Sequence, residues 1–433
     1  MHDNMKKIFI YVEACETRLL DGTRLYKYFK ENGYEIVYEP EDADIIIFIT
    51  CSFGNILVDH QIVKIKEFQK YDSELIISGC LPAVKKEELA KIFDGKVLIT
   101  KDIEKIDDLF PDNKIKFNEI DDANVPLELI FGSREFYRNK LIENIKTKMR
   151  KIKGIEKFYL KTYKKFWIHI YNNLFDWVPI ISRFYIFEPY FVVRISRGCF
   201  KKQPCSSYLD VSKAVGPLKS KSIDQCVKEF KKGLKEGYKL FIINGDDPGA
   251  YGLDINSNYP ELIKKIQEIP GDYEIEIENL TQYWLVKYID ELEEIVKKQK
   301  ISRIGVLIES GSSRIVELMG RYSDIQKTKE ALLRLKKADP KLKLFTHFVV
   351  GFPTETEEEF QETLDLIRDV GFDTGYIYKI SYEFKTDVDH LEPKISEAEI
   401  SKRLNHAKKF LEKLGYHVAF SRCFKGIMFN KRK

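Results

Sequence analysis

The sequence lacks the features of a membrane, secreted or disordered protein. No run of roughly 18 uncharged apolar residues occurs, because charged residues and two prolines interrupt the most apolar segment, residues 166–194. The opening residues contain neither a long apolar core nor a small-residue cleavage site, so no secretory signal is predicted. With 44% hydrophobic and 32% charged residues, the composition predicts a folded, cytoplasmic protein without a membrane span.

Cysteine and net charge are also scarce. Seven cysteines, an odd number in 433 residues, argue against a disulfide framework and favour metal or catalytic use. A formal net charge of +4 is too small to indicate a nucleic-acid partner by itself. The length allows two or three domains of ordinary size, and we expect a monomer.

Residues 1–110 alternate short apolar strands with amphipathic helices, which predicts a parallel α/β sheet domain. Cys15, Cys51 and Cys80 each fall at or just after the end of a predicted strand. Because the carboxyl ends of parallel strands share one sheet edge, the three thiols are expected to meet there as a common site. The alternative is three ordinary half-buried cysteines.

Residues 111–189 are predicted to be a linker or insertion rich in charge and then in aromatic residues. Residues 134–165 contain 12 Lys/Arg against 3 Asp/Glu, with aromatic residues interleaved. That combination suits contacts with phosphates and bases, although a solvated helical face would look the same.

From residue 190 to 390 the alternation resumes over six strands, which predicts an open six-strand (β/α)6 partial TIM barrel. A C-terminal helix and a short basic tail are expected over residues 391–433. Active sites of such barrels lie at the carboxyl ends of the strands. Residues at those ends are candidates for a ligand site, and they are Gly245, Asp246, Asp247, Glu309, Ser310, Gly311 and Gly351. Plain turn formation is the alternative for the glycines.

Several motifs together resemble the radical S-adenosylmethionine (SAM) methylthiotransferases. They are "EAC" at 13–15, "TCS" at 50–52, "SGCLP" at 78–82, "SRGC" at 196–199, "NGDDPGAYGLD" at 244–254, "ESGSSRIVELMGRYS" at 309–323 and "FVVGFPTETEEEF" at 348–360. The likeness covers roughly residues 6–110 and 190–385. It implies S-adenosylmethionine, bound in a nucleoside-sized pocket at the seven strand-end residues named above. It also implies an auxiliary 4Fe–4S cluster on Cys15, Cys51 and Cys80, and a second 4Fe–4S cluster at the barrel.

The sequence departs from the family at the barrel cluster. Where the family has Cys-x3-Cys-x2-Cys, this chain has Cys199, Cys205 and Tyr208 in a Cys-x5-Cys-x2-Tyr arrangement. Tyr208 as an oxygen ligand, a distant thiol such as Cys226 or Cys423, and a lost or labile cluster all stay open. Glu309 replaces a usual Gln, His347 stands where Asp is common, and the RNA-binding TRAM domain is expected to be absent.

The resemblance implies an enzyme that inserts sulfur, as a methylthio group, into a C–H bond of a tRNA nucleoside or a protein side chain. The implied partners are S-adenosylmethionine, a flavodoxin or ferredoxin as electron donor, and a substrate that binds through residues 134–165. The alternatives are a degenerate, non-radical homologue that carries sulfur or binds a partner, and another radical SAM reaction on a non-RNA substrate.

Overall fold

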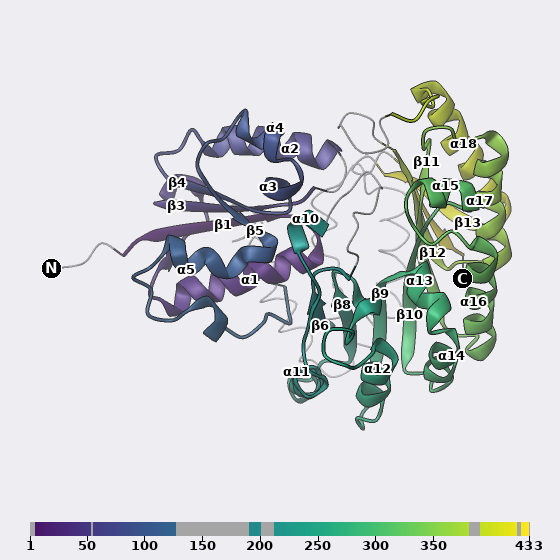
Figure 1. Ribbon diagram of the computed structural model, residues 1–433, viewed down its shortest axis with the longest axis horizontal. Helices are drawn as coiled ribbons and strands as arrows, with labels where there is room; N and C mark the ends of the chain where they lie inside the picture. Colours follow the sequence, from purple (N-terminus) through teal and green to yellow (C-terminus); the bar gives the residue numbers. More distant parts are fainter. Residues whose placement is uncertain are drawn as a thin grey trace, which may run out of the picture. The chain divides into compact units, whose positions relative to one another are not determined.

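The computed structural model describes residues 5–52, 55–126, 190–200, 212–380, 390–421 and 426–432. The chain divides into two units, residues 1–51 with 59–188 and residues 52–58 with 189–433. Each unit has its own β-sheet (Figure 1). Among the helices of the described ranges, none combines the length and apolar character that crossing a bilayer requires.

The leading unit is a five-stranded parallel sheet with the order β2-β1-β3-β4-β5. Its strands are β1 (Lys7–Glu13), β2 (Glu35–Ile36), β3 (Ile45–Thr50), β4 (Glu74–Gly79) and β5 (Lys96–Ile99). Its helices are α1 (Glu16–Glu31), α2 (Asn55–Phe68), α3 (Leu81–Val84), α4 (Lys86–Ala90) and α5 (Ile106–Leu109), with short 3-10 turns at Pro40–Asp42, Thr100–Lys105 and Phe117–Glu119. Strand β3, "IIIFIT", is buried throughout because helices cover both faces of the sheet.

Alternate residues of β1 pack on opposite helices. Ile8 and Ile10 belong to one apolar cluster with Leu25 and Phe29 of α1. On the other face, the Phe9 and Tyr11 rings lie 6.0 and 5.6 Å from the ring of Phe68 in α2. Figure 1 shows α1 and α5 on one side of this sheet and α2 and α4 on the other.

The core of the leading unit extends beyond residue 110, where the sequence places its end. Phe117 is fully buried in that core, and the Arg24 guanidinium lies 4.3 Å from the centroid of its ring. Arg24 Nε also donates to the carbonyl oxygen of Ile120 at 2.9 Å. Phe117 and Ile120 of the predicted linker therefore pack on α1, while residues 127–189 lie outside the described ranges.

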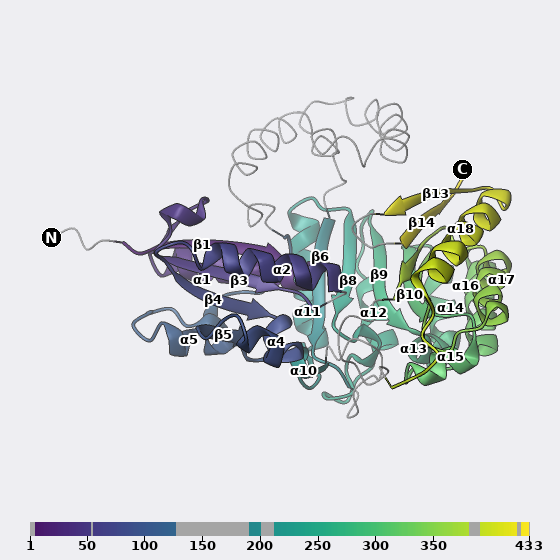
Figure 2. The same ribbon diagram turned by 90° about the horizontal axis from the view of Figure 1, so that it is seen from above.

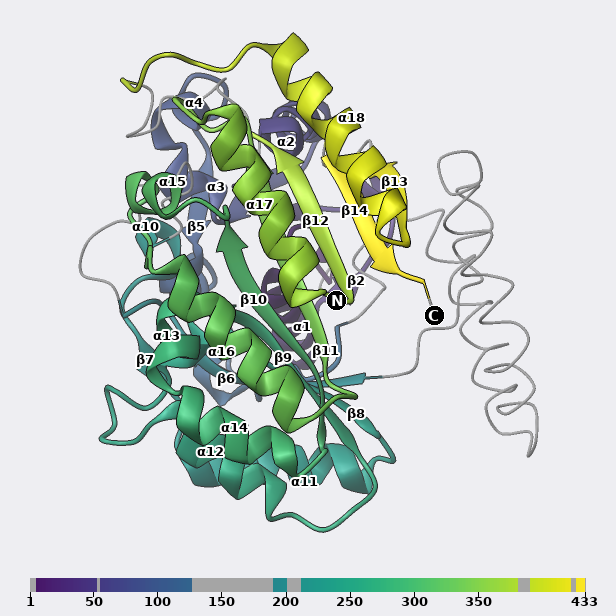
Figure 3. The same ribbon diagram turned by 90° about the vertical axis from the view of Figure 1, so that its right-hand side faces the viewer.

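The second unit confirms the predicted open six-strand barrel. Its six parallel strands are β6 (Tyr190–Arg197), β8 (Leu240–Gly245), β9 (Glu274–Thr281), β10 (Ile301–Glu309), β11 (Lys343–Val350) and β12 (Thr374–Lys379). Figure 3 shows α11, α12, α14, α16 and α17 along the outer side of these strands. The helices are α10 (Ser212–Val215), α11 (Ile223–Lys235), α12 (Tyr259–Gln267), α13 (Gln282–Lys287), α14 (Ile289–Lys297), α15 (Ser313–Leu318), α16 (Ile325–Ala338), α17 (Glu357–Val370) and α18 (Glu397–Lys413), with a 3-10 turn at Pro248–Ala250.

Antiparallel strands extend this sheet at both edges. Strand β7 (Lys219–Ser220) pairs with β6, and β14 (Gly426–Lys431) pairs with β12 and with β13 (Tyr416–Ser421). The sequence predicts a basic tail after α18, but this tail carries a hairpin that lies beside α18 (Figure 2). The hairpin is stabilised by its pairing with β12. The sequence of such short strands does not show which strand they will pair with.

Candidate functional site

The three leading cysteines follow three neighbouring strands. In the sheet register, Glu13 pairs with Thr50 and Thr50 pairs with Gly79. Cys51 and Cys80 come directly after the paired positions, and Cys15 comes two residues after Glu13. Adjacent strands lie about 4.8 Å apart, so the three backbones share one sheet edge roughly 10 Å wide. Cys15 is exposed, whereas Cys51 and Cys80 are buried.

Gln61 of α2 ties two of these strand ends together. Its side chain is fully buried; Nε2 donates to the Glu13 carbonyl oxygen at 2.7 Å. Oε1 accepts from the backbone N–H of Cys51 at 3.3 Å. The amide therefore holds the ends of β1 and β3 in fixed relation, two residues before Cys15 and at Cys51 itself.

The thiols are not gathered as ready ligands. Cys80 Sγ lies 3.9 Å from Thr100 Oγ1, and Cys15 is at the N-cap of α1. In the ranges that the structure covers, no three His, Cys, Asp or Glu side chains stand at metal-binding geometry. Three soft thiols at one edge fit an iron–sulfur group chemically, and holding it requires the side chains to turn toward a common point.

The second cysteine site follows β6, the first barrel strand. Gly198 adopts a left-handed conformation (φ +77°), and a Cβ there would stand 2.0 Å from the Pro217 carbonyl oxygen. The Cys199 N–H donates to the carbonyl oxygen of Gly216 at 3.0 Å. The backbone around Cys199 is therefore closely fixed, while Cys205 and Tyr208 lie outside the described residues.

Asp246 and Asp247, expected to face the cofactor, both contact the Cys199 segment. The Gly198 N–H donates to Asp246 Oδ2 at 2.8 Å, and Asp247 Oδ2 lies 3.5 Å from Cys199 Sγ. Trp284 Nε1 donates to Asp247 Oδ1 at 2.9 Å and so orients that carboxylate. These contacts position the cysteine; cofactor binding by the two aspartates stays a prediction.

The barrel sheet has two chemically different faces. On the helix side, β9 and β10 contribute Ile275, Ile277, Ile304 and Val306 to the main apolar cluster. The alternating residues of the six strands face the other way. A few are apolar, such as Val192 and Ile242, but most are polar or aromatic, among them Arg194, Asn244, Glu276, Glu278, Arg303, Glu309, His347, Tyr376 and Tyr378. A parallel sheet with two packed apolar faces would read as continuous hydrophobic runs. The polar face therefore indicates a lining for a polar ligand.

Glu309 ends β10 on that polar face. Its side chain is 2% exposed; Oε1 lies 2.9 Å from Arg321 Nη2 and 3.1 Å from His347 Nε2. Its φ of +74° is rare for a residue with a side chain. The next two predicted residues, Ser310 and Gly311, are buried against Thr363 of α17, whose Oγ1 accepts from the Gly311 N–H at 2.8 Å.

The predicted glycines approach protein atoms closely. A Cβ on Gly311 would lie 2.5 Å from the Glu362 carbonyl oxygen, and one on Gly351 would lie 2.6 Å from the Ile400 side chain. A Cβ on Gly245 would clash with one atom alone, the Ser196 hydroxyl oxygen at 2.8 Å. Packing alone therefore accounts for Gly311 and Gly351, and a cofactor contact stays a prediction for all three.

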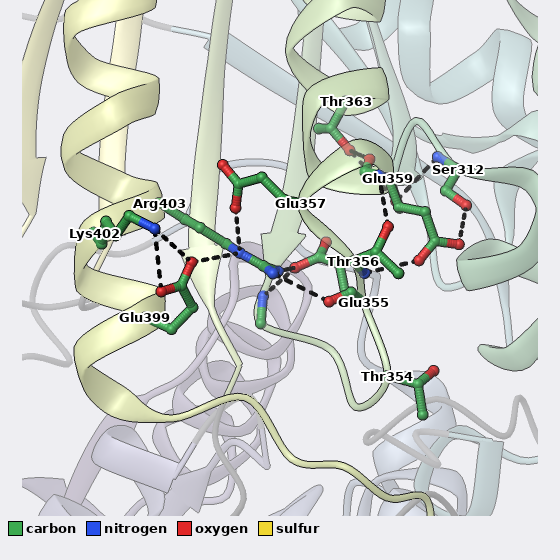
Figure 4. A network of polar contacts seen from close by, with 12 residues as sticks. Ser312, Thr354, Glu355, Thr356, Glu357, Glu359, Thr363, Glu399, Lys402 and Arg403 are labelled. Atoms are coloured by element: carbon green, nitrogen blue, oxygen red, sulfur yellow. Dashed lines mark hydrogen bonds and ion pairs between the residues drawn. The ribbon is translucent and has the colours of Figure 1, made fainter.

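The sequence reading missed a buried ion pair beside the Gly-Phe-Pro segment. Glu355 Oε2 accepts from Arg403 Nη1 at 2.7 Å and from the Gly351 N–H at 2.8 Å (Figure 4). Burial raises the pKa of Glu355 to about 7, although Arg403 and Gly351 oppose the rise. Arg403 lies on α18, 48 residues after Glu355 in the sequence. An arginine on a helix is usually exposed to solvent, so the local sequence does not reveal this buried pair.

The same segment contains backbone strain. Thr354 has φ +67°, an outlier for a β-branched residue. Arg314 holds Thr354 in this conformation, because Nη2 donates to the Thr354 carbonyl oxygen at 2.8 Å and the guanidinium pairs with Glu359 at 2.7 Å.

Cys226, which the sequence indicates as a possible distant ligand of the barrel cluster, is fully buried in the main apolar cluster, and burial raises its pKa to about 12. Such a thiol is unsuited to ligation.

Comparison with known proteins identifies both units. The Radical SAM superfamily model matches residues 195–367, and the model for Uncharacterized protein family UPF0004 matches residues 7–100. Among solved structures, the fold is similar to that of the radical S-adenosylmethionine methyltransferase TsrM of Kitasatospora setae, with a TM-score of 0.55 at 9% identity over 87% of this chain and 75% of that one. That likeness shows the fold alone.

Curated relatives extend over most of the chain. A probable threonylcarbamoyladenosine tRNA methylthiotransferase of Pyrococcus horikoshii is 26% identical over 84% of this chain and 74% of its own length. A ribosomal protein uS12 methylthiotransferase of Thermodesulfovibrio yellowstonii is 27% identical over 93% and 81%. A tRNA-2-methylthio-N(6)-dimethylallyladenosine synthase of Clostridium botulinum is 26% identical over 94% and 82%. The two units therefore resemble those of the radical SAM methylthiotransferases, and these likenesses indicate an enzyme of the transferase type.

Proposed function

We propose that this enzyme inserts sulfur, as a methylthio group, into a C–H bond of an adenosine in tRNA. The observation that carries the proposal is the polar barrel face, which ends at Glu309 on β10 and beside Cys199, two residues after the end of β6. Two of the three relatives described above are named for modified adenosines of tRNA, which supports the substrate class.

The residues of the chain have separate roles in this proposal. Cys15, Cys51 and Cys80 would hold the auxiliary cluster, and Cys199 with Cys205 would hold the barrel cluster, with Tyr208 or another group as the third ligand. Bound clusters and S-adenosylmethionine supply electron transfer and radical chemistry, while the chain supplies binding and orientation. Gln61 would keep two auxiliary cysteines in register, and Asp247 with Trp284 would orient Cys199.

Iron content after anaerobic reconstitution tests the cluster assignment. The wild-type chain is expected to bind about eight irons, and about four irons would leave a single cluster. Replacing Cys15, Cys51 and Cys80 together by Ala should remove about four irons, and Cys199→Ala should remove the others. Cys226→Ala is the matched control, because its buried thiol should leave the iron content unchanged.

Product analysis tests the substrate. With a reductant and S-adenosylmethionine, we expect 5′-deoxyadenosine and a methylthio nucleoside in digested tRNA, measured by mass spectrometry. A methylthio group on ribosomal protein uS12 instead would replace the tRNA proposal with a protein substrate. Four irons without 5′-deoxyadenosine would support the alternative, a non-radical homologue that carries sulfur or binds a partner.

A further inference from the structure

Glu309 and His347 form one unit on the polar face of the barrel. The sequence shows each as a separate departure from the family pattern, Glu for Gln and His for Asp. In the structure the two side chains contact each other, with His347 Nε2 3.1 Å from Glu309 Oε1. An Asp at position 347 would supply a hydrogen-bond acceptor. In this chain Glu309 supplies the acceptor, and the ring of His347 is its hydrogen-bonding partner.

The charge of Glu309 determines which ring nitrogen carries the proton. Arg321 Nη2 lies 2.9 Å from Glu309 Oε1, and a guanidinium at that distance favours the carboxylate form. A carboxylate only accepts hydrogen bonds, so His347 must donate through Nε2–H. In the neutral ring Nδ1 is then an acceptor. Among the described residues, none is hydrogen-bonded to Nδ1.

The backbone at Glu309 is strained in support of this arrangement. A φ of +74° is uncommon for a residue with a side chain, and such strain collects at functional sites. Gly311, two residues on, is fixed against α17 by its hydrogen bond to Thr363. The strained turn thus directs the carboxylate toward His347, rather than toward solvent.

The surroundings of His347 suit an aromatic ligand with a donor group. The imidazole is 13% exposed and lies 5.5 Å from the Tyr378 ring, which in turn stacks on Tyr376 at 5.5 Å. Both tyrosines lie on the same polar face as His347, on the next strand. A nucleobase presents an aromatic face and, in adenine, an exocyclic N–H donor.

We propose that His347 contacts the substrate, accepting a hydrogen bond at Nδ1 from the exocyclic N–H of a purine, and that Glu309 is its positioning residue. The inference rests on the proposed function for its substrate class. The hydrogen bond between Glu309 and His347 does not involve the substrate, so it can be tested without enzymatic activity.

Nitrogen-15 NMR of the histidine-labelled full chain tests the pair. At pH 8 we expect the neutral ring of His347 in the Nε2–H form, assigned by loss of its signals in His347→Gln. Glu309→Ala removes the acceptor and should yield a mixture of both tautomers. A wild-type ring protonated at Nδ1 would overturn the proposal, whatever the enzyme acts on.

Two replacements at His347 then test the substrate contact in the reconstituted enzyme with tRNA. His347→Gln can still donate to Glu309 but has no acceptor where Nδ1 stood, whereas His347→Asn keeps an acceptor near Nδ1. We expect the KM for tRNA to rise about tenfold in the Gln variant, the equivalent of one hydrogen bond. The Asn variant should show a smaller rise in KM.

The outcomes separate the two proposals. An unchanged KM in His347→Gln, with an intact thermal transition, would assign the residue a structural role and overturn the substrate contact. If the wild-type enzyme does not modify tRNA, the proposed function and the purine contact both fail. The NMR result would in that case still decide whether Glu309 positions His347.

Discussion

At the scale of single residues, two glycines predicted alike differ in what surrounds them. A Cβ on Gly311 would collide with the backbone of α17 at 2.5 Å, and that backbone cannot rotate away. A Cβ on Gly245 would meet the Ser196 hydroxyl, which can change rotamer.

We therefore expect Gly311→Ala to lower the free energy of unfolding by about 3 kcal/mol and Gly245→Ala by less than about 1 kcal/mol. Chemical denaturation of both variants measures the difference. If both substitutions lowered the free energy of unfolding equally, the close approach of Gly311 to α17 would not be the reason that glycine is required there.

Glu355 makes stability depend on pH. Its pKa is about 7 in the folded chain, against an ordinary 4.5, so folding favours its neutral form. The stability that this preference contributes is fully present below pH 4.5 and is lost as the pH rises through about 7.

Glu355→Gln mimics the neutral acid, so it should gain stability relative to wild type between those pH values, by up to about 3 kcal/mol. Urea midpoints at pH 5 and pH 8 measure the gain. Glu359→Gln is the control with the opposite sign, because Arg314 lowers the pKa of Glu359 to about 2. A Glu355→Gln effect that is equal at both pH values would contradict the expectation.

At the scale of elements, Arg403 connects α18 to the segment that follows β11. It is 5% exposed and contacts both the side chain and the carbonyl oxygen of Glu355. Removing it leaves a buried carboxylate without its cation, which commonly costs 3–5 kcal/mol.

Arg403→Met should accordingly lower stability by about 3 kcal/mol at pH 8, where Glu355 is mostly ionised, and by less at pH 5. In the Glu355→Gln background the same change should cost less, because no buried charge is left unpaired. A double-mutant cycle at both pH values checks this. Additive effects would show that the two side chains do not interact.

At the scale of the whole molecule, the described apolar residues form two separate clusters. Ile47 lies in the cluster of the leading sheet, and Ile277 lies in that of the barrel. Both side chains are fully buried. Each unit thus has a core of its own, which allows it to unfold as a unit.

We expect two calorimetric transitions for the full chain. Ile47→Ala should lower the midpoint of one and Ile277→Ala that of the other, each by the equivalent of 2–5 kcal/mol. A single transition that both variants shift equally would show that the chain unfolds cooperatively.

The α/β alternation, the six parallel barrel strands and the strand-end positions of Cys15, Cys51 and Cys80 could all be predicted from the amino-acid sequence. These features follow from periodicity and from chain order, which are local properties. Motif spacing along the chain also indicated the family.

The contacts between distant side chains could not be predicted in this way, because they depend on the fold. Glu309 with His347, Glu355 with Arg403, and Asp247 with Cys199 are 38 to 48 residues apart, and no local pattern joins them. The β13–β14 hairpin likewise depends on its pairing with β12. Such contacts are set by strand order and by burial, because a buried charge is stable only beside a partner that the fold supplies.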